Sequence, residues 1–118
     1  MPASPAAATD APRALLVFTS LPDAASAETL ASALIGRRLA ACVNILAPCT
    51  SIYRWQGATE TATEVPVLIK TTPARYAALE AAIRARHPYE LPEIVAVPVT
   101  QGLPGYLDWI VAETAGDD

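Results

Sequence analysis

The chain has 118 residues, of which 53% are hydrophobic and 17% charged, so a single domain can bury an extensive apolar core. Its formal net charge is −4, and its eight lysines and arginines are scattered, which excludes a general nucleic-acid-binding protein. No run of residues is long and apolar enough to cross a bilayer as a helix, and we expect no membrane partner.

The first 13 residues, MPASPAAATDAPR, contain three prolines and five alanines, with no basic start and no continuous apolar segment. We predict a disordered tail there, followed by one domain over residues 14–115. Because no export signal is recognisable, we expect the protein in the cytoplasm. Cys42 and Cys49 are then expected to be reduced thiols, and their spacing matches no zinc-ligand motif.

The first two expected elements are a strand and a helix. Residues 14–20, ALLVFTS, form a short apolar run rich in strand-forming side chains. Pro22 ends this run and is expected to open a helix, because proline suits the first helical turn. The helix is predicted to end at 36–38. Its apolar face, at three- and four-residue spacing, consists of Ala27, Leu30, Ala31, Leu34 and Ile35.

Three further runs predict a long hairpin. The run at 39–46 indicates a strand, and strand-like alternation continues at 50–57 after a break at Pro48. Polar residues at 57–63 indicate a turn, and the run at 64–71 returns as the partner strand. A hairpin of this length is expected to overhang a domain of this size.

A second helix is predicted up to Arg86. Thr72 and Pro73 match an N-cap and a first helical position. The helix must end before Pro88, because a following proline disfavours helical geometry at His87. The apolar stripe of this helix consists of Tyr76, Leu79 and Ile83.

The last expected elements are a fourth strand and a short helix. LPEIVAVPV at 91–99 predicts the strand, with an interruption at Pro98, and the helix is expected from Pro104. The resulting order is β-α-β-β-α-β with a C-terminal helix. This order predicts an α+β, ferredoxin-like fold, in which two helices cover one face of an antiparallel sheet.

Such a sheet leaves one face uncovered and has edges whose backbone groups need shielding. Oligomerisation would cover the exposed face and shield the edges, with the overhanging hairpin and the terminal helix packed on a neighbouring copy. Trp55 and Trp109 lie on these two segments, and aromatic residues are enriched at interfaces. We therefore predict that both tryptophans belong to a subunit interface.

Six segments occur in a characteristic order and spacing. They are AACVN (40–44), SIYRWQG (51–57), Glu64 followed by LIKT (68–71), HPYELPEI (87–94), PVTQG (98–102) and YLDWI (106–110). Together they resemble the CutA divalent-cation-tolerance family. The resemblance covers residues 14 to about 113, and the combination of segments is specific, whereas any single one is not. It implies a homotrimer similar in outline to PII signalling proteins, with a cytoplasmic role in tolerance of copper and other divalent metals.

His87 is the only histidine and the first candidate for a metal ligand. A neutral imidazole binds copper, zinc or nickel, and we expect His87 at the rim of an inter-subunit cleft beside Tyr89 and Glu93. In the competing interpretation His87 only ends the second helix, where an imidazolium suits the helix dipole. Cys42 is a weaker candidate, because a cysteine in a buried strand is more often a core residue. Copper or another divalent metal is the expected cofactor, without being firmly required.

Six residues combine aromatic surfaces with both signs of charge, a mixture typical of a cleft for a small polar ligand. The competing interpretation is a set of interface contacts, which we favour for Tyr53 and Trp55. Lys70 lies in an otherwise apolar strand and is expected to need a carboxylate partner from Glu64, Glu90 or Glu93. The six cleft residues are Tyr53, Trp55, Glu64, Lys70, Tyr89 and Glu93.

Two classes of function follow from these residues. The first is a non-enzymatic trimeric binding or signalling protein that responds to a divalent metal or a small ligand. The second is an enzyme that acts on a small polar metabolite in the inter-subunit cleft, with His87 or Glu93 as acid or base and Lys70 as an electrophilic group. We favour the first, because no nucleophile is paired with a recognisable base and no glycine-rich phosphate loop is present.

Overall fold

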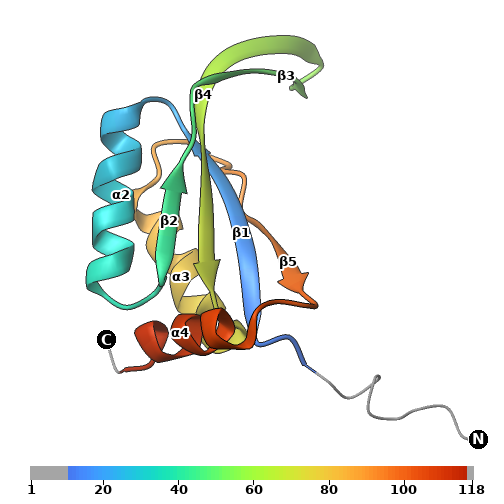
Figure 1. The fold of residues 1–118 in the computed structure, drawn as a ribbon. Helices are drawn as coiled ribbons and strands as arrows, with labels where there is room; N and C mark the ends of the chain where they lie inside the picture. Colours follow the sequence, from blue (N-terminus) through green and yellow to red (C-terminus); the bar gives the residue numbers. More distant parts are fainter. Residues whose placement is uncertain (1–10, 117–118) are drawn as a thin grey trace, which may run out of the picture.

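The computed structural model describes residues 11–116 and contains a five-stranded antiparallel sheet and three helices (Figure 1). Residues 1–10 of the predicted tail lie outside the described residues. The elements, in chain order, are β1 (Ala14–Leu21), α2 (Ala24–Gly36), β2 (Cys42–Ile45), β3 (Cys49–Trp55), β4 (Ala58–Thr71), α3 (Pro73–Arg86), β5 (Val95–Val99) and α4 (Pro104–Thr114).

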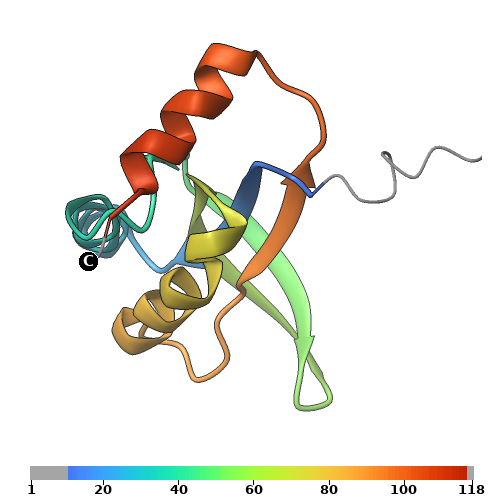
Figure 2. The same ribbon diagram turned by 90° about the horizontal axis from the view of Figure 1, so that it is seen from below.

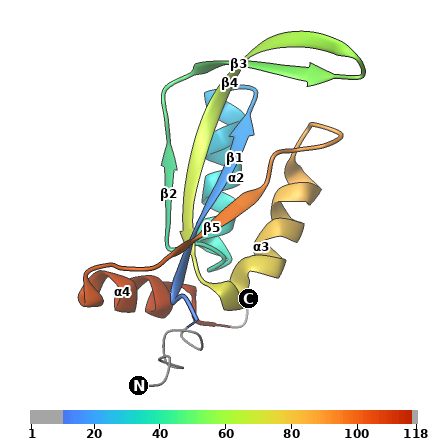
Figure 3. The same cartoon turned by 90° about the vertical axis from the view of Figure 1, so that its right-hand side faces the viewer.

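The strand order in the sheet is β2-β4-β1-β5, and β3 pairs with the far end of β4. Two β-α-β units, β1-α2-β2 and β4-α3-β5, are interleaved, so all neighbouring strands are antiparallel. The predicted order of elements and the C-terminal helix are confirmed, with the first arm of the hairpin divided into β2 and β3. The hairpin of β3 and β4 projects past the helices at one end of the sheet, and α4 lies at the other end (Figures 1 and 3).

The core lies between the sheet and helices α2 and α3, which cover the same face (Figure 2). Alternate residues of β1 and of the inner half of β4, from Val65 to Thr71, point into it, as the two-residue period of a strand requires. The predicted stripe of α2 is narrower than expected, because Ile35 is exposed and Ala31 is half-buried. The largest buried core side chains are Val17, Leu21, Leu34, Leu39, Val67, Ile69, Leu79 and Ile83.

The opposite face of the sheet carries large apolar side chains that no helix of the described chain covers fully. Phe18 pairs with both Leu68 and Val95, and Leu16 pairs with Lys70 and Val97, so these residues alternate with the core positions. Phe18, Val95 and Val97 are all exposed. We call the surface formed by Leu16, Phe18, Leu68, Lys70, Val95 and Val97 the open face.

Helix α2 begins at Ala24, two residues later than the position of Pro22 predicted. Asp23 is the N-cap, and its carboxylate accepts a hydrogen bond of 2.8 Å from the backbone N–H of Ser26. Pro22 therefore precedes the cap and does not occupy the first helical turn. Helix α3 begins at Pro73 and ends at Arg86, with His87 extended at its C-terminal cap, as the position of Pro88 predicted.

The turn predicted at 57–63 is wrong, because the hairpin closes in two residues. Gln56 and Gly57 have φ angles of 50° and 84°, and Trp55 pairs directly with Ala58. Two consecutive positive φ angles are the geometry of a type I′ turn, which suits the right-handed twist of two strands. The polar residues that follow are therefore the outer part of β4.

The last strand is shorter than predicted and is not interrupted. Residues 91–94 are a loop, and β5 begins only at Val95. It continues through Pro98, which pairs with Leu15 of β1. Because β5 is an edge strand, a proline that lacks a backbone N–H is tolerated there.

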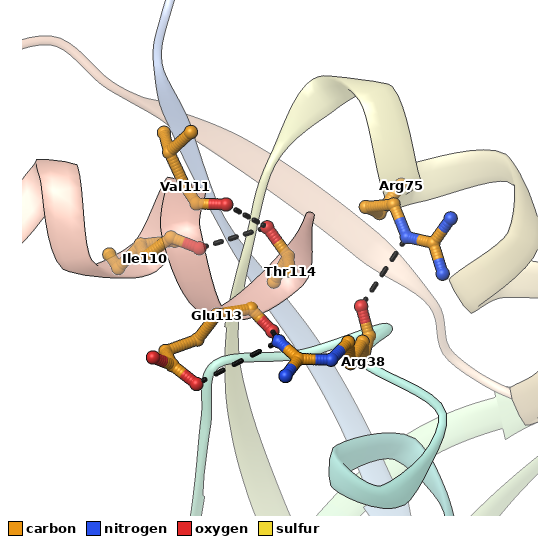
Figure 4. Close-up of polar contacts among 6 residues, drawn as sticks. All are labelled: Arg38, Arg75, Ile110, Val111, Glu113 and Thr114. Atoms are coloured by element: carbon orange, nitrogen blue, oxygen red, sulfur yellow. Dashed lines mark hydrogen bonds and ion pairs between the residues drawn. The ribbon is translucent and has the colours of Figure 1, made fainter. Parts of the chain in front are cut away.

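A polar network fastens the C-terminal end of the domain (Figure 4). Arg38 donates to the carbonyl oxygen of Glu113 at 3.2 Å, and Arg75 donates to the carbonyl oxygen of Arg38 at 3.3 Å. The Thr114 hydroxyl donates to the carbonyl of Ile110 within α4 at 2.8 Å. These contacts join α4 to the turn after α2 and to the start of α3.

Arg13 forms an ion pair with Asp108 of α4, so the described residues at the end of the predicted tail contact the domain. Within residues 11–116, no helix has the length and apolar character needed to traverse a bilayer.

Candidate functional site

A groove opens where the projecting hairpin meets the loop after α3. Its volume is about 640 Å³. Side chains come from the end of β1, from β3, from β4 and from the loop at 89–93. We call it the hairpin groove, and its lining residues are Ser20, Ser51, Tyr53, Trp55, Glu64, Tyr89, Glu90, Leu91, Pro92 and Glu93.

The alternation of β3 explains why its polar and aromatic side chains face this groove. Ser51, Tyr53 and Trp55 are two residues apart and therefore share one face of the strand. Cys49 pairs with Glu64 and Ser51 pairs with Ala62, so the Glu64 side chain lies on the same face, diagonal to Ser51. The hairpin thus supplies one aromatic and acidic wall.

The loop after α3 supplies the other wall, and His87 holds this loop in place. The His87 Nε2 lies 2.6 Å from the carbonyl oxygen of Ser20, and the backbone N–H of Tyr89 donates to Nδ1 at 3.2 Å. This pair of contacts requires a neutral ring with its proton on Nε2, because a carbonyl only accepts and Nδ1 here accepts. The loop is therefore tied to the end of β1.

His87 does not stand at the rim of the cleft, as the sequence had led us to expect. Its side chain is buried, and it is not among the groove-lining residues. Its ring packs beside that of Tyr89, with the ring centroids 4.7 Å apart. Both ring nitrogens are engaged in the described chain. A metal ion at His87 would have to displace one of the two partners.

The electrostatics of the groove are acidic. Three of its lining residues, Glu64, Glu90 and Glu93, are carboxylates, and none of the lining residues is basic. Burial raises the pKa of the Tyr89 hydroxyl. The negative charge of the Glu64 carboxylate, and a hydrogen bond between the two side chains, raise this pKa further. Tyr89 therefore keeps its proton at neutral pH and presents an O–H donor beside a carboxylate.

Of the six predicted cleft residues, the structure brings five together, and Lys70 is the exception. Lys70 lies on the open face between Leu16 and Cys42, with its ammonium group 5.8 Å from the ring centroid of Tyr106. Among residues 11–116, Lys70 forms no ion pair with Glu64, Glu90 or Glu93, so the expected carboxylate partner is wrong. Glu64 lies six positions away along β4, a distance of about 20 Å. Lys70 instead makes a cation–π contact with α4.

Neither thiol is among the groove-lining residues, but Cys49 lies at the edge of the groove, opposite Glu64 and with its sulfur 3.8 Å from the Ser51 hydroxyl. Cys42 is half-buried with its sulfur 3.8 Å from the side-chain oxygen of Asn44, and Cys49 is exposed. Both are free. Within residues 11–116, no three His, Cys, Asp or Glu side chains gather closely enough to hold a metal ion.

Both tryptophans predicted at an interface are partly exposed in the single chain, by 38% for Trp55 and 41% for Trp109. Trp55 lines the hairpin groove. Trp109 lies on α4, where its ring packs beside Tyr106 at 5.4 Å between centroids. Their exposure leaves aromatic surface free at both ends of the sheet.

The sequence did not assign five of the lining residues to the cleft, namely Ser20, Ser51, Glu90, Leu91 and Pro92. Ser51 could have been found from alternation, because it precedes Tyr53 by two residues on the same strand face. Ser20 carried no such signal. It reaches the groove because β1 ends beside a loop 67 residues later in the chain.

Comparisons with known proteins agree with this architecture. A family model described as CutA1 divalent ion tolerance protein matches residues 15–113. The divalent-cation tolerance protein CutA of Thermus thermophilus is 46% identical over 99 residues, which cover 84% of this chain and 96% of that protein. None of these descriptions names a catalysed reaction.

Solved structures show the same fold. CutA from Xylella fastidiosa superposes with a TM-score of 0.85 at 46% identity, covering 87% of this chain and 99% of that one. A protein from Archaeoglobus fulgidus, described as periplasmic divalent cation tolerance protein CutA, superposes with a TM-score of 0.84 at 35% identity, covering 86% and 99%. The chain therefore belongs to the CutA1 divalent ion tolerance protein family.

Proposed function

We propose that this protein is a non-catalytic homotrimer that binds a small ligand and serves divalent-cation tolerance in a PII-like manner. The observation that carries the proposal is the open face, an uncovered apolar sheet surface beside an overhanging hairpin. Three copies packed through these faces would cover the exposed aromatic and aliphatic side chains. Each hairpin groove would then lie close to a neighbouring subunit.

The exposure of the open face supports assembly. Val95 is 50% and Val97 43% exposed, and Phe18 stands between two apolar neighbours on adjacent strands. Contiguous apolar surface of this kind is typical of interaction sites. The hairpin adds Ile52, which is 70% exposed on the side opposite Tyr53. A trimer, the assembly implied by the sequence resemblance, accounts for both surfaces together.

For metal, we propose weak binding of copper or another divalent ion, with the cysteine thiols favoured over His87. The contacts of His87 to Ser20 and Tyr89 support a structural role, because a metal must break one of them. Cys49 is exposed and free, and thiolates are soft ligands that suit copper. We keep Cys42 as the second thiol and His87 as the third candidate.

We propose the cytoplasm as the compartment, in keeping with two free cysteines. Fractionation of cells that express the full-length chain tests this proposal, and recovery of the protein with periplasmic markers would refute it.

The assembly is tested by replacing Phe18 with Glu, which places a charge in the proposed interface. Ala78→Glu, on the exposed surface of α3, is the matched control. We expect Phe18→Glu to lower the mass in solution and Ala78→Glu to leave it unchanged. A mass unaffected by Phe18→Glu, with the fold intact by circular dichroism, would refute an interface at the open face.

A further inference from the structure

The chemistry of the hairpin groove points to a class of ligand, an inference that rests on the proposed ligand-binding role. We propose that the groove binds an organic cation, an alkylammonium or guanidinium group, rather than a bare metal ion. The inference follows from the charge, the aromatic walls and the spacing of the lining residues.

The first argument is charge. Glu64, Glu90 and Glu93 line the groove without a lysine, arginine or histidine among the lining residues. In the part of the chain that the structure describes, the ion pairs are Arg13–Asp108 and Arg38–Glu113, so these three carboxylates have no cationic partner. A concave acidic surface raises the local concentration of cations.

The second argument is the aromatic surface. Tyr53, Trp55 and Tyr89 line the same groove, and Tyr53 and Trp55 are 43% and 38% exposed in the single chain. The face of an aromatic ring is electron-rich and attracts ammonium and guanidinium groups. In such a groove the carboxylates and ring faces attract the charged group of an organic cation, and the rings also pack against its apolar stem. Leu91 and Pro92 extend the apolar lining.

The third argument separates an organic cation from a metal. A divalent metal needs several oxygen, nitrogen or sulfur ligands at about 2.0–2.6 Å from one point. Among residues 11–116, no three acidic, histidine or cysteine side chains converge in this way. The carboxylates are instead spread around a groove of about 640 Å³, a size typical of small-molecule sites. Carboxylates spread in this way suit a larger organic molecule that carries a cationic group, rather than a single metal ion.

Isothermal titration calorimetry on the full-length protein tests this site with three probes of equal chain length. These are n-butylammonium, n-butylguanidinium and uncharged n-butanol. We expect saturable binding of the two cations and none of the alcohol. Glu64→Gln should weaken cation binding about fivefold, the effect of an exposed charge pair. Trp55→Leu should weaken it about threefold through the lost cation–π contact.

Glu28→Gln is the matched control, because Glu28 is an exposed carboxylate of α2 outside the groove lining. It should leave the affinity unchanged. The inference is overturned if neither cation binds, if n-butanol binds equally well, or if Glu28→Gln weakens binding as much as Glu64→Gln. It is also overturned if Mg²⁺ displaces n-butylammonium at one ion per groove.

A capped glycyl-arginyl-glycine peptide distinguishes the source of the cation. Binding tighter than that of n-butylguanidinium supports the site and assigns it to a side chain of another protein chain. Equal or weaker binding supports the site and assigns it to a free small molecule. A trimer that binds neither cation refutes the inference alone, whereas a monomer that binds them refutes the proposed assembly alone.

Discussion

His87 and Ser20 are joined by a contact of 2.6 Å between the imidazole Nε2 and the main-chain carbonyl oxygen. The two residues belong to segments far apart in the sequence, the end of α3 and the end of β1. Since the backbone N–H of Tyr89 donates to the other ring nitrogen, one buried imidazole fixes the path of the loop that forms a wall of the hairpin groove.

Replacing His87 by Ala should therefore destabilise the protein by about 1–3 kcal/mol, because it leaves a carbonyl and an N–H without their partners. The free energy of unfolding, measured with urea, checks this expectation. His87→Gln retains hydrogen-bonding groups, so it should lower the free energy of unfolding by less than His87→Ala does. A His87→Ala variant with the same free energy of unfolding as the original chain would show that the contact does not stabilise the fold.

Gly57 is the second residue of the hairpin turn and has a φ angle of 84°. An L-residue with a Cβ is strained there, so Gly57→Ala should destabilise by about 1 kcal/mol. Gly105→Ala is the matched control, because Gly105 lies within α4 with no atom within 4 Å of an added Cβ. Urea unfolding should show this control as neutral or stabilised by about 0.5–1 kcal/mol. Equal effects of both changes would contradict the type I′ turn.

The Asp23 cap should make stability depend on pH. The Ser26 backbone N–H, and secondarily its hydroxyl, hold the pKa of Asp23 below its ordinary value of 3.8. Because the folded pKa is lower than the unfolded one, the cap stabilises fully above the unfolded value and loses its effect as pH falls through the folded pKa. The melting temperature of Asp23→Ala should lie below that of the original chain at pH 7, and the difference should vanish at low pH. A difference that stays constant down to pH 2 would contradict this account.

Copper binding should follow the thiols. A Cys42→Ser, Cys49→Ser variant is expected to lose about tenfold or more in copper affinity, because serine is a harder and weaker ligand than thiolate. His87→Gln should retain the affinity, since this imidazole is already engaged by Ser20 and Tyr89. Competition titration against a chromogenic chelator measures both. A loss of affinity confined to His87→Gln would return the metal site to the imidazole.

Local patterns predicted the order of strands and helices because each element carries its own signal. Helix α3 is an example, because its signals all come from residues close together in the sequence. They are its apolar stripe, its cap at Thr72 and its end before Pro88. The hairpin turn was misplaced for the same reason. Polar residues at 57–63 resemble a loop in the sequence. In the single chain, however, the outer part of β4 is largely exposed to solvent, so its residues need not alternate between apolar and polar.

The site was less predictable because it depends on distances along and between strands. Glu64 and Lys70 share one face of β4, which alternation reveals, but their separation along the strand places only Glu64 in the groove. The role of His87 depended on a main-chain carbonyl of Ser20, and a main-chain acceptor leaves no trace in residue identity.

The mass of the full-length chain in solution tests the central claim, the homotrimer, most directly. Light scattering on a size-exclusion peak at micromolar concentration should give about three times the chain mass of 12.4 kDa. A peak with the mass of one chain would contradict the assembly and leave the open face unexplained.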